Sequence, residues 1–255
     1  MLDLVDTHAH LDDHSFDPDR GAMFDRAAGA GVRRWIVPAI DRGNWETIEV
    51  LCAAREGAFP AYGLHPLLIG AHRDEHLAEL PTWLDGHGAI AVGEIGLDFY
   101  VEGLDPARQR EVFVRQLEIA REHNLPVIVH ARRAFEETIQ TLRRFRGLRG
   151  VVHSFSGSEE QARQLFDLGF HIGIGGPVTY DRANRIRRVV ASMPLEWLLL
   201  ETDAPDQPCA HHRGERNEPA FMMDVLETIA TLRNESVEDI AAATTANAVK
   251  LFKLA

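Results

Sequence analysis

Two histidines near the start of the chain, His8 and His10, have the spacing of a metal-binding pair. They follow a short apolar segment in the run Asp6-Thr7-His8-Ala9-His10. Side chains on a strand alternate with a period of two, so both imidazoles would leave the same face, together with Asp6. Imidazole is the commonest metal ligand near neutral pH. The spacing therefore indicates that His8 and His10 bind one divalent cation.

Other ionisable residues follow short apolar runs further along the chain. They are His65, Glu94, His130, His153 and Asp203. Leaving His65 aside, four imidazoles and two carboxylates exceed the need of one tetrahedral cation, and suit two cations that share a bridging carboxylate and a bridging water. We expect Glu94 to bridge the two cations. The remaining ligands divide into His8, His10 and Asp203 for one cation, and His130 and His153 for the other.

Eight short apolar runs are the elements that would bring these residues together. They cover residues 2–5, 34–38, 59–63, 90–93, 127–129, 150–152, 171–174 and 197–200, each followed by a loop and an amphipathic helical pattern. This alternation indicates parallel strands with right-handed crossovers. Eight units favour an α/β fold with a closed (β/α)8 TIM barrel, and residues 237–254 predict an extra C-terminal helix packed on its outside. The carboxyl ends of all strands would then meet at one mouth, where barrel enzymes hold their active sites.

The chain shows no linker, low-complexity tract or repeat, so we expect residues 1–255 to form a single domain. A doubly wound open sheet is the rival architecture, but no G-x-G-x-x-G or Walker motif follows any predicted strand. Residues 173–176, Gly-Ile-Gly-Gly, lack that spacing. They indicate a tight turn, or the close approach of a ligand to the backbone.

Charge and cysteine content exclude several classes of protein. A formal net charge of -12 argues against a broad basic surface that coats nucleic acid, but allows a local phosphate site. Cys52 and Cys209 form no ligand pair or disulfide framework and are expected to be free thiols. The chain has neither a signal-peptide pattern nor an apolar run near 18 residues, so we expect a cytoplasmic protein without membrane contact. Strands and inner helix faces account for its apolar positions, so we expect a monomer without an obligate protein partner.

Six segments resemble the motifs of the TatD family, a group of amidohydrolase-like metal-dependent hydrolases. They are DTHAHLD (6–12), GLHP (63–66), GEIGLD (93–98), VHAR (129–132), HSFSG (153–157) and ETDAP (201–205). The segments follow the family's order from the first predicted strand to beyond the eighth. The family's Arg-Asn-x-Pro element is present at residues 216–219. His211 and His212 precede it in a stretch where family members vary, and belong either to a surface loop or to the substrate site.

The resemblance implies a metal-dependent hydrolase with the same six ligands that the strand ends indicate. They are His8, His10, Glu94, His130, His153 and Asp203. Family members are described as deoxyribonucleases or as uncharacterised hydrolases, so we expect a deoxyribonuclease or other phosphodiesterase, similar to a 3'-5' exonuclease, acting on DNA or another phosphoester. A hydroxide that bridges the cations would attack phosphorus while the cations neutralise its oxygens. Asp203 would serve as general base, and Glu94 would hold the cations.

Neighbouring residues are expected to support this centre. Glu201 lies two residues before Asp203 on the same strand face and, with Asp6 and Asp98, would orient the ligands. His65 and Arg132 are expected to contact the substrate phosphate. The two divalent cations would be zinc, manganese or magnesium, because imidazole favours zinc and manganese while carboxylate and phosphate oxygens favour magnesium and manganese.

Two other functions stay open at the level of sequence. The same centre could hydrolyse an amide, an ester or a small phosphoester, because the hydroxide can also attack a carbonyl carbon. A narrow mouth would favour such a small substrate, whereas aromatic or arginine side chains leading away from the mouth would favour a nucleic-acid strand. A non-enzymatic adaptor barrel would instead need cations that protein ligands enclose completely.

Overall fold

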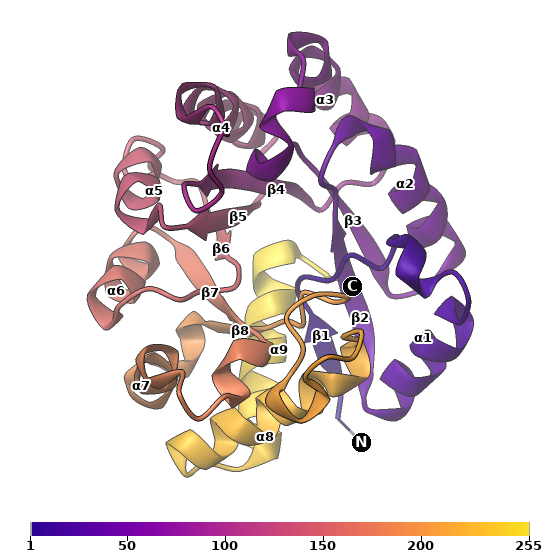
Figure 1. Ribbon diagram of the computed structural model, residues 1–255, viewed down its shortest axis with the longest axis vertical. Helices are drawn as coiled ribbons and strands as arrows, with labels where there is room; N and C mark the ends of the chain where they lie inside the picture. Colours follow the sequence, from indigo (N-terminus) through magenta and orange to yellow (C-terminus); the bar gives the residue numbers. More distant parts are fainter. Residues whose placement is uncertain (1, 255) are drawn as a thin grey trace.

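Strands β1 to β8 form one parallel sheet in sequence order in the computed structural model, which describes residues 2–254 (Figure 1). Their bounds are β1 Leu4–Asp6, β2 Val32–Pro38, β3 Ala58–Tyr62, β4 Ala91–Asp98, β5 Val127–Arg132, β6 Gly150–Val152, β7 Phe170–Ile174 and β8 Leu198–Leu200. The backbone N–H of Thr7 donates to the carbonyl oxygen of Leu200 at 3.0 Å, so the end of β1 meets the end of β8. The predicted (β/α)8 TIM barrel is confirmed.

Helices alternate with the strands and surround the sheet (Figure 1). Their bounds are α1 Arg20–Gly29, α2 Trp45–Ala54, α3 Asp74–Gly86, α4 Pro106–Glu122, α5 Phe135–Leu142, α6 Glu159–Asp167, α7 Asn184–Ser192, α8 Met222–Arg233 and α9 Val237–Phe252. Short 3-10 turns lie in the connections: η1 His14–Phe16, η2 Arg42–Asn44, η3 Pro66–Ala71, η4 Gly176–Thr179, η5 Leu195–Trp197, η6 Ala210–His212 and η7 Pro219–Phe221. Within residues 2–254, no helix is long and apolar enough to cross a membrane.

Local capping explains where helices α4 and α6 begin. The Asp105 carboxylate accepts hydrogen bonds from the N–H groups of Ala107 and Arg108, and Pro106 occupies the first turn of α4, where its missing N–H costs nothing. Ser158 and Gln161 form a reciprocal capping box at the start of α6. Both helices therefore begin where a side chain satisfies free N–H groups of the first turn.

Strand limits differ from the predicted ranges where neighbouring strands pair beyond the apolar run. β4 continues to Asp98 and β5 to Arg132 because Gly96 pairs with His130 and Asp98 pairs with Arg132. The apolar pattern predicted ends at residues 93 and 129. The extension matters for function, because it carries His130 and Arg132 on a rigid strand rather than on a loop.

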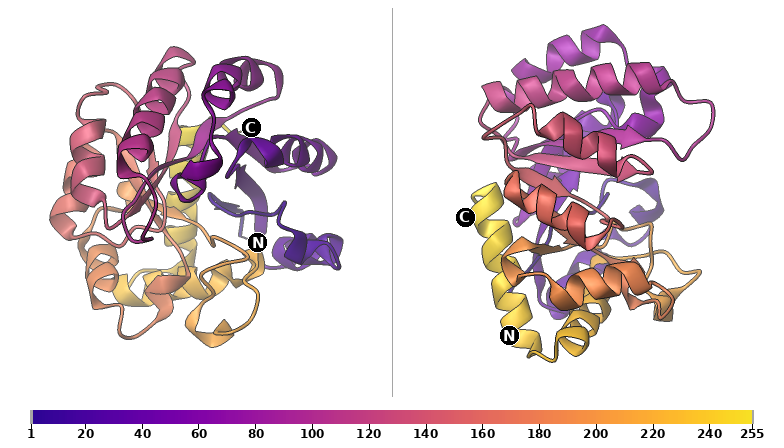
Figure 2. Two further views of the ribbon diagram at one scale, coloured as in Figure 1. Left: turned by 45° about the horizontal axis from the view of Figure 1, so that its top comes forward. Right: turned by 90° about the vertical axis from the view of Figure 1, so that its left-hand side faces the viewer.

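Helix α9 covers the end of the barrel opposite the carboxyl ends of the strands. The inner side chains at that end come from seven strands and from the helix itself. They are Val5, Ile36, Ala61, Ala91, Ile128, Val151 and Leu199, packed with Ala248, Leu251, Phe252 and Leu254. In Figure 2 the helix runs across one end of the barrel, so the extra helix lies outside the barrel as predicted but at its base rather than in the outer ring. The base is therefore a closed apolar core, and polar chemistry is confined to the other end.

Candidate metal centre

A cavity of about 770 Å³ opens at the carboxyl ends of the strands. Its wall includes most of the residues that the sequence singled out: His10, His65, Glu94, His130, Arg132, His153 and Asp203. His8 lies directly beneath this wall and is fully buried. Residues that are up to 195 positions apart in the chain (8 to 203) thus share one site.

Backbone hydrogen bonds near the carboxyl ends of the strands hold these residues in place. The N–H of Asp203 donates to the carbonyl of His8 at 2.9 Å, and the N–H of His153 donates to the carbonyl of Val129 at 3.0 Å. The N–H of Glu94 donates to the carbonyl of Ala39 at 2.8 Å. The first two bonds continue the sheet pattern past the strand ends, and the third joins β4 to the residue after β2. The backbone thus fixes the spacing between these residues before any side chain is considered.

The Glu94 carboxylate lies at the centre of the site and is 1% exposed. Its Oε2 atom is 3.1 Å from Nε2 of His8 and 3.6 Å from Nε2 of His10. Its Oε1 atom lies 2.7 Å from Nε2 of His153 and 3.0 Å from Nδ1 of His130. Each oxygen faces a different pair of histidines, and these are the pairs into which the sequence divided them.

The spacing of the ring nitrogens matches what a cation would require. Two nitrogen ligands of one tetrahedral zinc, each about 2.0–2.1 Å from the metal, lie about 3.3–3.4 Å apart. The Nε2 atoms of His8 and His10 are 3.3 Å apart, and Nδ1 of His130 is 3.2 Å from Nε2 of His153. Asp203 adds Oδ1 at 3.5 Å and 3.7 Å from the first pair. The spacing of these donor atoms around Glu94 therefore fits the coordination of divalent metal.

The ionisation of these groups shows how strongly the site favours positive charge. Burial by itself would raise the pKa of Glu94, but the surrounding imidazoles, His153 first, hold that pKa well below its usual range. Burial would lower the pKa values of His153 and His10, but the Glu94 carboxylate raises them to about 10 and about 9. The protons on His10 and His153 therefore occupy positions at which the positive charge of a metal ion could replace them.

Asp203 has an unusual backbone conformation, with φ of +59°. A non-glycine residue in the left-handed region stores strain that the surrounding structure must offset, and such residues cluster at functional sites. The Gln207 amide donates a hydrogen bond to Oδ2 of Asp203 and leaves Oδ1 facing the histidines. Burial raises the pKa of Asp203, which makes it a better proton acceptor near neutral pH.

Asn217 and its neighbours fasten the loop that carries Asp203. The side-chain amide of Asn217 donates to the carbonyls of Thr202 and Asp206 at 2.9 Å and 2.7 Å. Arg216 donates to Asp19 at 2.7 Å, and so ties this loop to the connection after β1. The element at residues 216–219 is thus a structural clamp, a role that its sequence pattern alone did not reveal.

Asp6 and Asp98 lie outside the ring of ligand atoms and hold it from behind. Asp6 accepts hydrogen bonds from the hydroxyl of Thr202 at 2.6 Å and from the N–H of His8 at 3.2 Å, which joins β1 to β8. Burial raises the pKa of Asp6 to about 7. Oδ2 of Asp98 lies 2.9 Å from Nε2 of His130, which leaves Nδ1 of that ring directed at Glu94.

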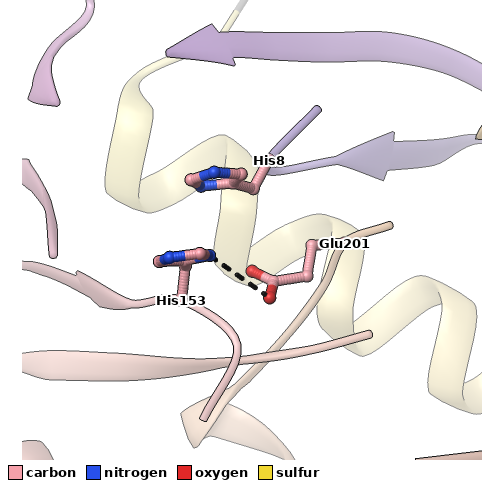
Figure 3. A group of neighbouring side chains, drawn as sticks. All are labelled: His8, His153 and Glu201. Carbon is pink, nitrogen blue, oxygen red and sulfur yellow. Dashed lines mark ion pairs between the residues drawn. The ribbon is translucent and has the colours of Figure 1, made fainter. Parts of the chain in front are cut away.

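Glu201 lies beside His153 and below His8 in the view of Figure 3, and so is close to one histidine of each pair. The rings of His8 and His153 are stacked 3.9 Å apart, and Nδ1 of His153 is 3.9 Å from Oε1 of Glu201. Among the described residues, Nδ1 of both rings and Oε2 of Glu201 are buried without a hydrogen-bond partner, yet one atom from each residue lies within 4.8 Å of the others. The Glu201 carboxylate therefore lies near both rings without a hydrogen bond to either of them.

Gly173 on β7 makes room for this carboxylate. A Cβ atom at Gly173 would lie 2.0 Å from Oε2 of Glu201. At residues 173–176 the sequence predicted a tight turn or the close approach of a ligand. The first glycine instead accommodates the side chain of Glu201, which directly follows β8. The sequence does show a glycine at an inward strand position, but it does not show that Glu201 is the side chain that fills the space.

His65 is closer to the centre than its predicted role as a substrate contact required. Its Nε2 is 2.9 Å from Oε1 of Glu94, while its Nδ1 accepts a hydrogen bond from the N–H of Leu67 at 3.2 Å. Because Nδ1 is an acceptor, the proton of the neutral ring is on Nε2, which donates to Glu94. Burial keeps this ring neutral by lowering the pKa of His65 to about 4.

His211 and His212 do not line the mouth cavity. His211 is exposed, 3.6 Å from Asp224, and the ring of His212 stacks on Phe221 at 3.5 Å. The sequence left open a surface loop or the substrate site for these two histidines, and the structure places both on the surface.

Comparison with known proteins places the whole chain among metal-dependent hydrolases. Residues 5–253 match the family described as TatD related DNase. An uncharacterized metal-dependent hydrolase of Escherichia coli, YjjV, is 40% identical over 254 residues, with 98% of each chain covered. The crystal structure of the E. coli TatD homologue YjjV superposes with a TM-score of 0.95 at 39% identity, covering 99% of this chain and 98% of that one. A protein of Cronobacter sakazakii named 3'-5' ssDNA/RNA exonuclease TatD is 32% identical, with 98% and 97% covered.

Proposed function

The chain belongs to the family of TatD-related DNases, metal-dependent hydrolases, and we propose that it is a phosphodiesterase that shortens single-stranded nucleic acid from its 3' end. The observation that carries the proposal is the arrangement around Glu94, whose two oxygens each face a pair of imidazoles beneath an open cavity. The relative named 3'-5' ssDNA/RNA exonuclease supports the choice of bond and substrate.

The proposed ligands divide between two divalent cations that share Glu94. One set is His8, His10 and Asp203, and the other is His130 and His153. When bound, such cations neutralise phosphate oxygens and lower the pKa of coordinated water toward neutrality. The ligand types allow zinc, manganese or magnesium. Because the site opens into a cavity of about 770 Å³, the protein leaves space on the solvent side for a phosphodiester.

Three side chains of the site have separate roles in the proposed reaction. Asp203 accepts the proton of the attacking water through Oδ1, since Gln207 occupies its other oxygen. His65 stays neutral and donates its one N–H from Nε2 to Glu94, which stabilises the negative charge of that carboxylate. Glu201 lies close to the rings of His8 and His153, whose Nε2 atoms face Glu94, and its negative charge would favour their binding of positive charge.

A substrate panel with matched metal loading tests the proposal. Protein stripped with a chelator and reconstituted with zinc, manganese or magnesium is incubated with 5'-labelled single-stranded DNA and RNA, with duplex DNA, and with chromogenic phosphodiesters, phosphomonoesters, carboxyl esters and amides. We expect a ladder of products that shortens from the 3' end of single strands, and loss of this activity in Asp203→Asn. Turnover confined to small esters or amides would identify the alternative hydrolase. Full metal loading without turnover of any substrate would identify an adaptor.

A further inference from the structure

An aromatic and arginine surface leads from the mouth cavity to a second depression on the barrel rim. We define it by Tyr100, Arg132, Arg133 and Arg144, and call it the rim track. From the contacts below we infer that the rim track binds the retained part of a single-stranded nucleic acid whose 3' end lies in the mouth. The inference rests on the proposed function and adds the site at which the strand is held.

Arg132 and Arg133 both contact the ring of Tyr100. Their Cζ atoms lie 3.8 Å and 4.7 Å from the ring centroid. Consecutive residues on a strand direct their side chains to opposite faces, so two neighbouring arginines do not ordinarily meet one ring. Arg133 has a left-handed backbone, with φ of +53°, which ends the strand pattern and turns its side chain toward the same ring. The arrangement is maintained at the cost of local strain.

The track is continuous with the metal centre. Arg132 follows His130 by two residues on β5, so both lie on the face that lines the mouth cavity. Asp98 joins the two regions, since its Oδ2 lies 2.9 Å from Nε2 of His130 while its Oδ1 accepts the N–H groups of Tyr100 and Val101 at 2.9 Å and 3.1 Å. The carboxylate that orients a proposed metal ligand therefore also fixes the loop that carries the aromatic ring.

Beyond Tyr100 the track reaches a depression of about 720 Å³ over α5. Its wall includes Phe99, Arg133 and Arg144. It also includes two carboxylates, of which Glu137 is paired with Arg110 and Glu136 accepts from the Gln140 amide at 3.0 Å. Two adjacent arginines thus line two adjacent hollows, which gives a strand a path away from the mouth.

Charge and exposure identify the occupant as a polyanion with a flat apolar part. Within residues 2–254, no carboxylate forms an ion pair with Arg132, Arg133 or Arg144, although the chain as a whole carries -12. Tyr100 is 45% exposed, and it and its neighbour Val101 are two of the three large apolar residues that are exposed in the described chain. Guanidinium groups without an ion pair bind phosphate through their N–H edges, and an unpaired base stacks on an exposed ring or on a guanidinium plane that covers it. A duplex keeps its bases stacked inside and cannot use the ring in this way.

Variants at two positions outside the mouth cavity test the rim track. Tyr100→Leu removes the aromatic face, Tyr100→Phe keeps it, and Arg133→Ala removes one guanidinium. Each is compared with Arg163→Ala, which removes an exposed arginine of α6. The readouts are kcat and KM for a 5'-labelled single-stranded DNA 20-mer and for bis(p-nitrophenyl) phosphate, and binding of the same oligonucleotide by fluorescence anisotropy in an Asp203→Asn background at several salt concentrations.

We expect Tyr100→Leu and Arg133→Ala to raise KM and Kd for the oligonucleotide about tenfold, with little change in kcat and none with bis(p-nitrophenyl) phosphate. Arg133→Ala should also reduce the slope of log K against log salt by about 0.7, the value for one phosphate contact on a single strand. Tyr100→Phe and Arg163→Ala should behave like the unmodified protein.

The possible failures are distinguishable. If the unmodified protein shortens the oligonucleotide but Tyr100→Leu and Arg133→Ala leave KM, Kd and the salt slope unchanged, the rim track is refuted and the proposed function stands. If the unmodified protein neither cleaves nor binds the oligonucleotide, both are refuted. Equal losses with bis(p-nitrophenyl) phosphate would assign the residues to the fold of the mouth and refute a strand-binding role.

Discussion

Replacing Glu94 by glutamine should remove both cations, because one carboxylate serves both pairs of histidines. The amide retains the shape of the side chain but not its charge, and it places an N–H₂ group against imidazole nitrogens that now lie 2.7–3.6 Å from the carboxylate. Two unit charges 4 Å apart interact by about 4 kcal/mol at an effective dielectric constant near 20. A divalent cation loses at least this much when Glu94 is neutral, which corresponds to a Kd about a thousandfold weaker for each cation.

Metal content after dialysis, measured by mass spectrometry, and competition with chelators of known affinity provide the assay. Glu136→Gln is the matched control, because Glu136 is an exposed carboxylate near the same rim that contacts none of the histidines. Circular dichroism establishes that Glu94→Gln is folded. A folded Glu94→Gln protein that still holds two cations per chain with the affinity of the unmodified protein would refute the bridging role.

Three further perturbations address the residues around this centre. Asp203→Asn should retain both cations in elemental analysis but lose at least about a hundredfold in kcat, as expected for a lost general base; unchanged kcat would assign Asp203 to structure alone. Gly173→Ala should lower the free energy of unfolding in urea by about 1–3 kcal/mol, since its Cβ would collide with Glu201, and Glu201→Ala in the same chain should recover part of the loss; additive losses would contradict this contact. In chelator-treated protein, the pKa values of His10, His153 and Glu201 are raised to about 9, 10 and 8. Their protonated forms therefore stabilise the folded state fully below their ordinary pKa values, which are 6.5 for the two histidines and 4.5 for Glu201. This contribution is lost as the pH rises from those values to the raised ones, so Tm should fall between about pH 6.5 and pH 10 and zinc should restore it; a Tm that rises with pH over this interval would contradict these shifts.

The barrel and the gathering of the proposed ligands were predictable because both follow from periodicity along the chain. Short apolar runs alternate with amphipathic helices, and parallel strands bring their carboxyl ends to one mouth whatever the sequence between them. His8, His130 and Asp203 each follow such a run. Their convergence therefore required no knowledge of loops or side-chain conformations.

Contacts between loops distant in sequence were not predictable in this way. The clamp made by Asn217 depends on how the connection after β8 folds back, and the donor role of His65 depends on the N–H of Leu67. The left-handed backbone at Arg133 turns this side chain into the rim track, and an arginine in the sequence does not indicate such a conformation. Strand limits at β4 and β5 also depend on pairing between neighbours rather than on apolar residues.

Anomalous diffraction from crystals grown with zinc or manganese would test the proposed metal centre most directly. Two peaks are expected at the mouth, on either side of the Glu94 carboxylate, one contacted by His8 and His10 and the other by His130 and His153. Fully loaded crystals with cations bound only elsewhere on the protein, or with a single cation that does not touch Glu94, would contradict the shared centre.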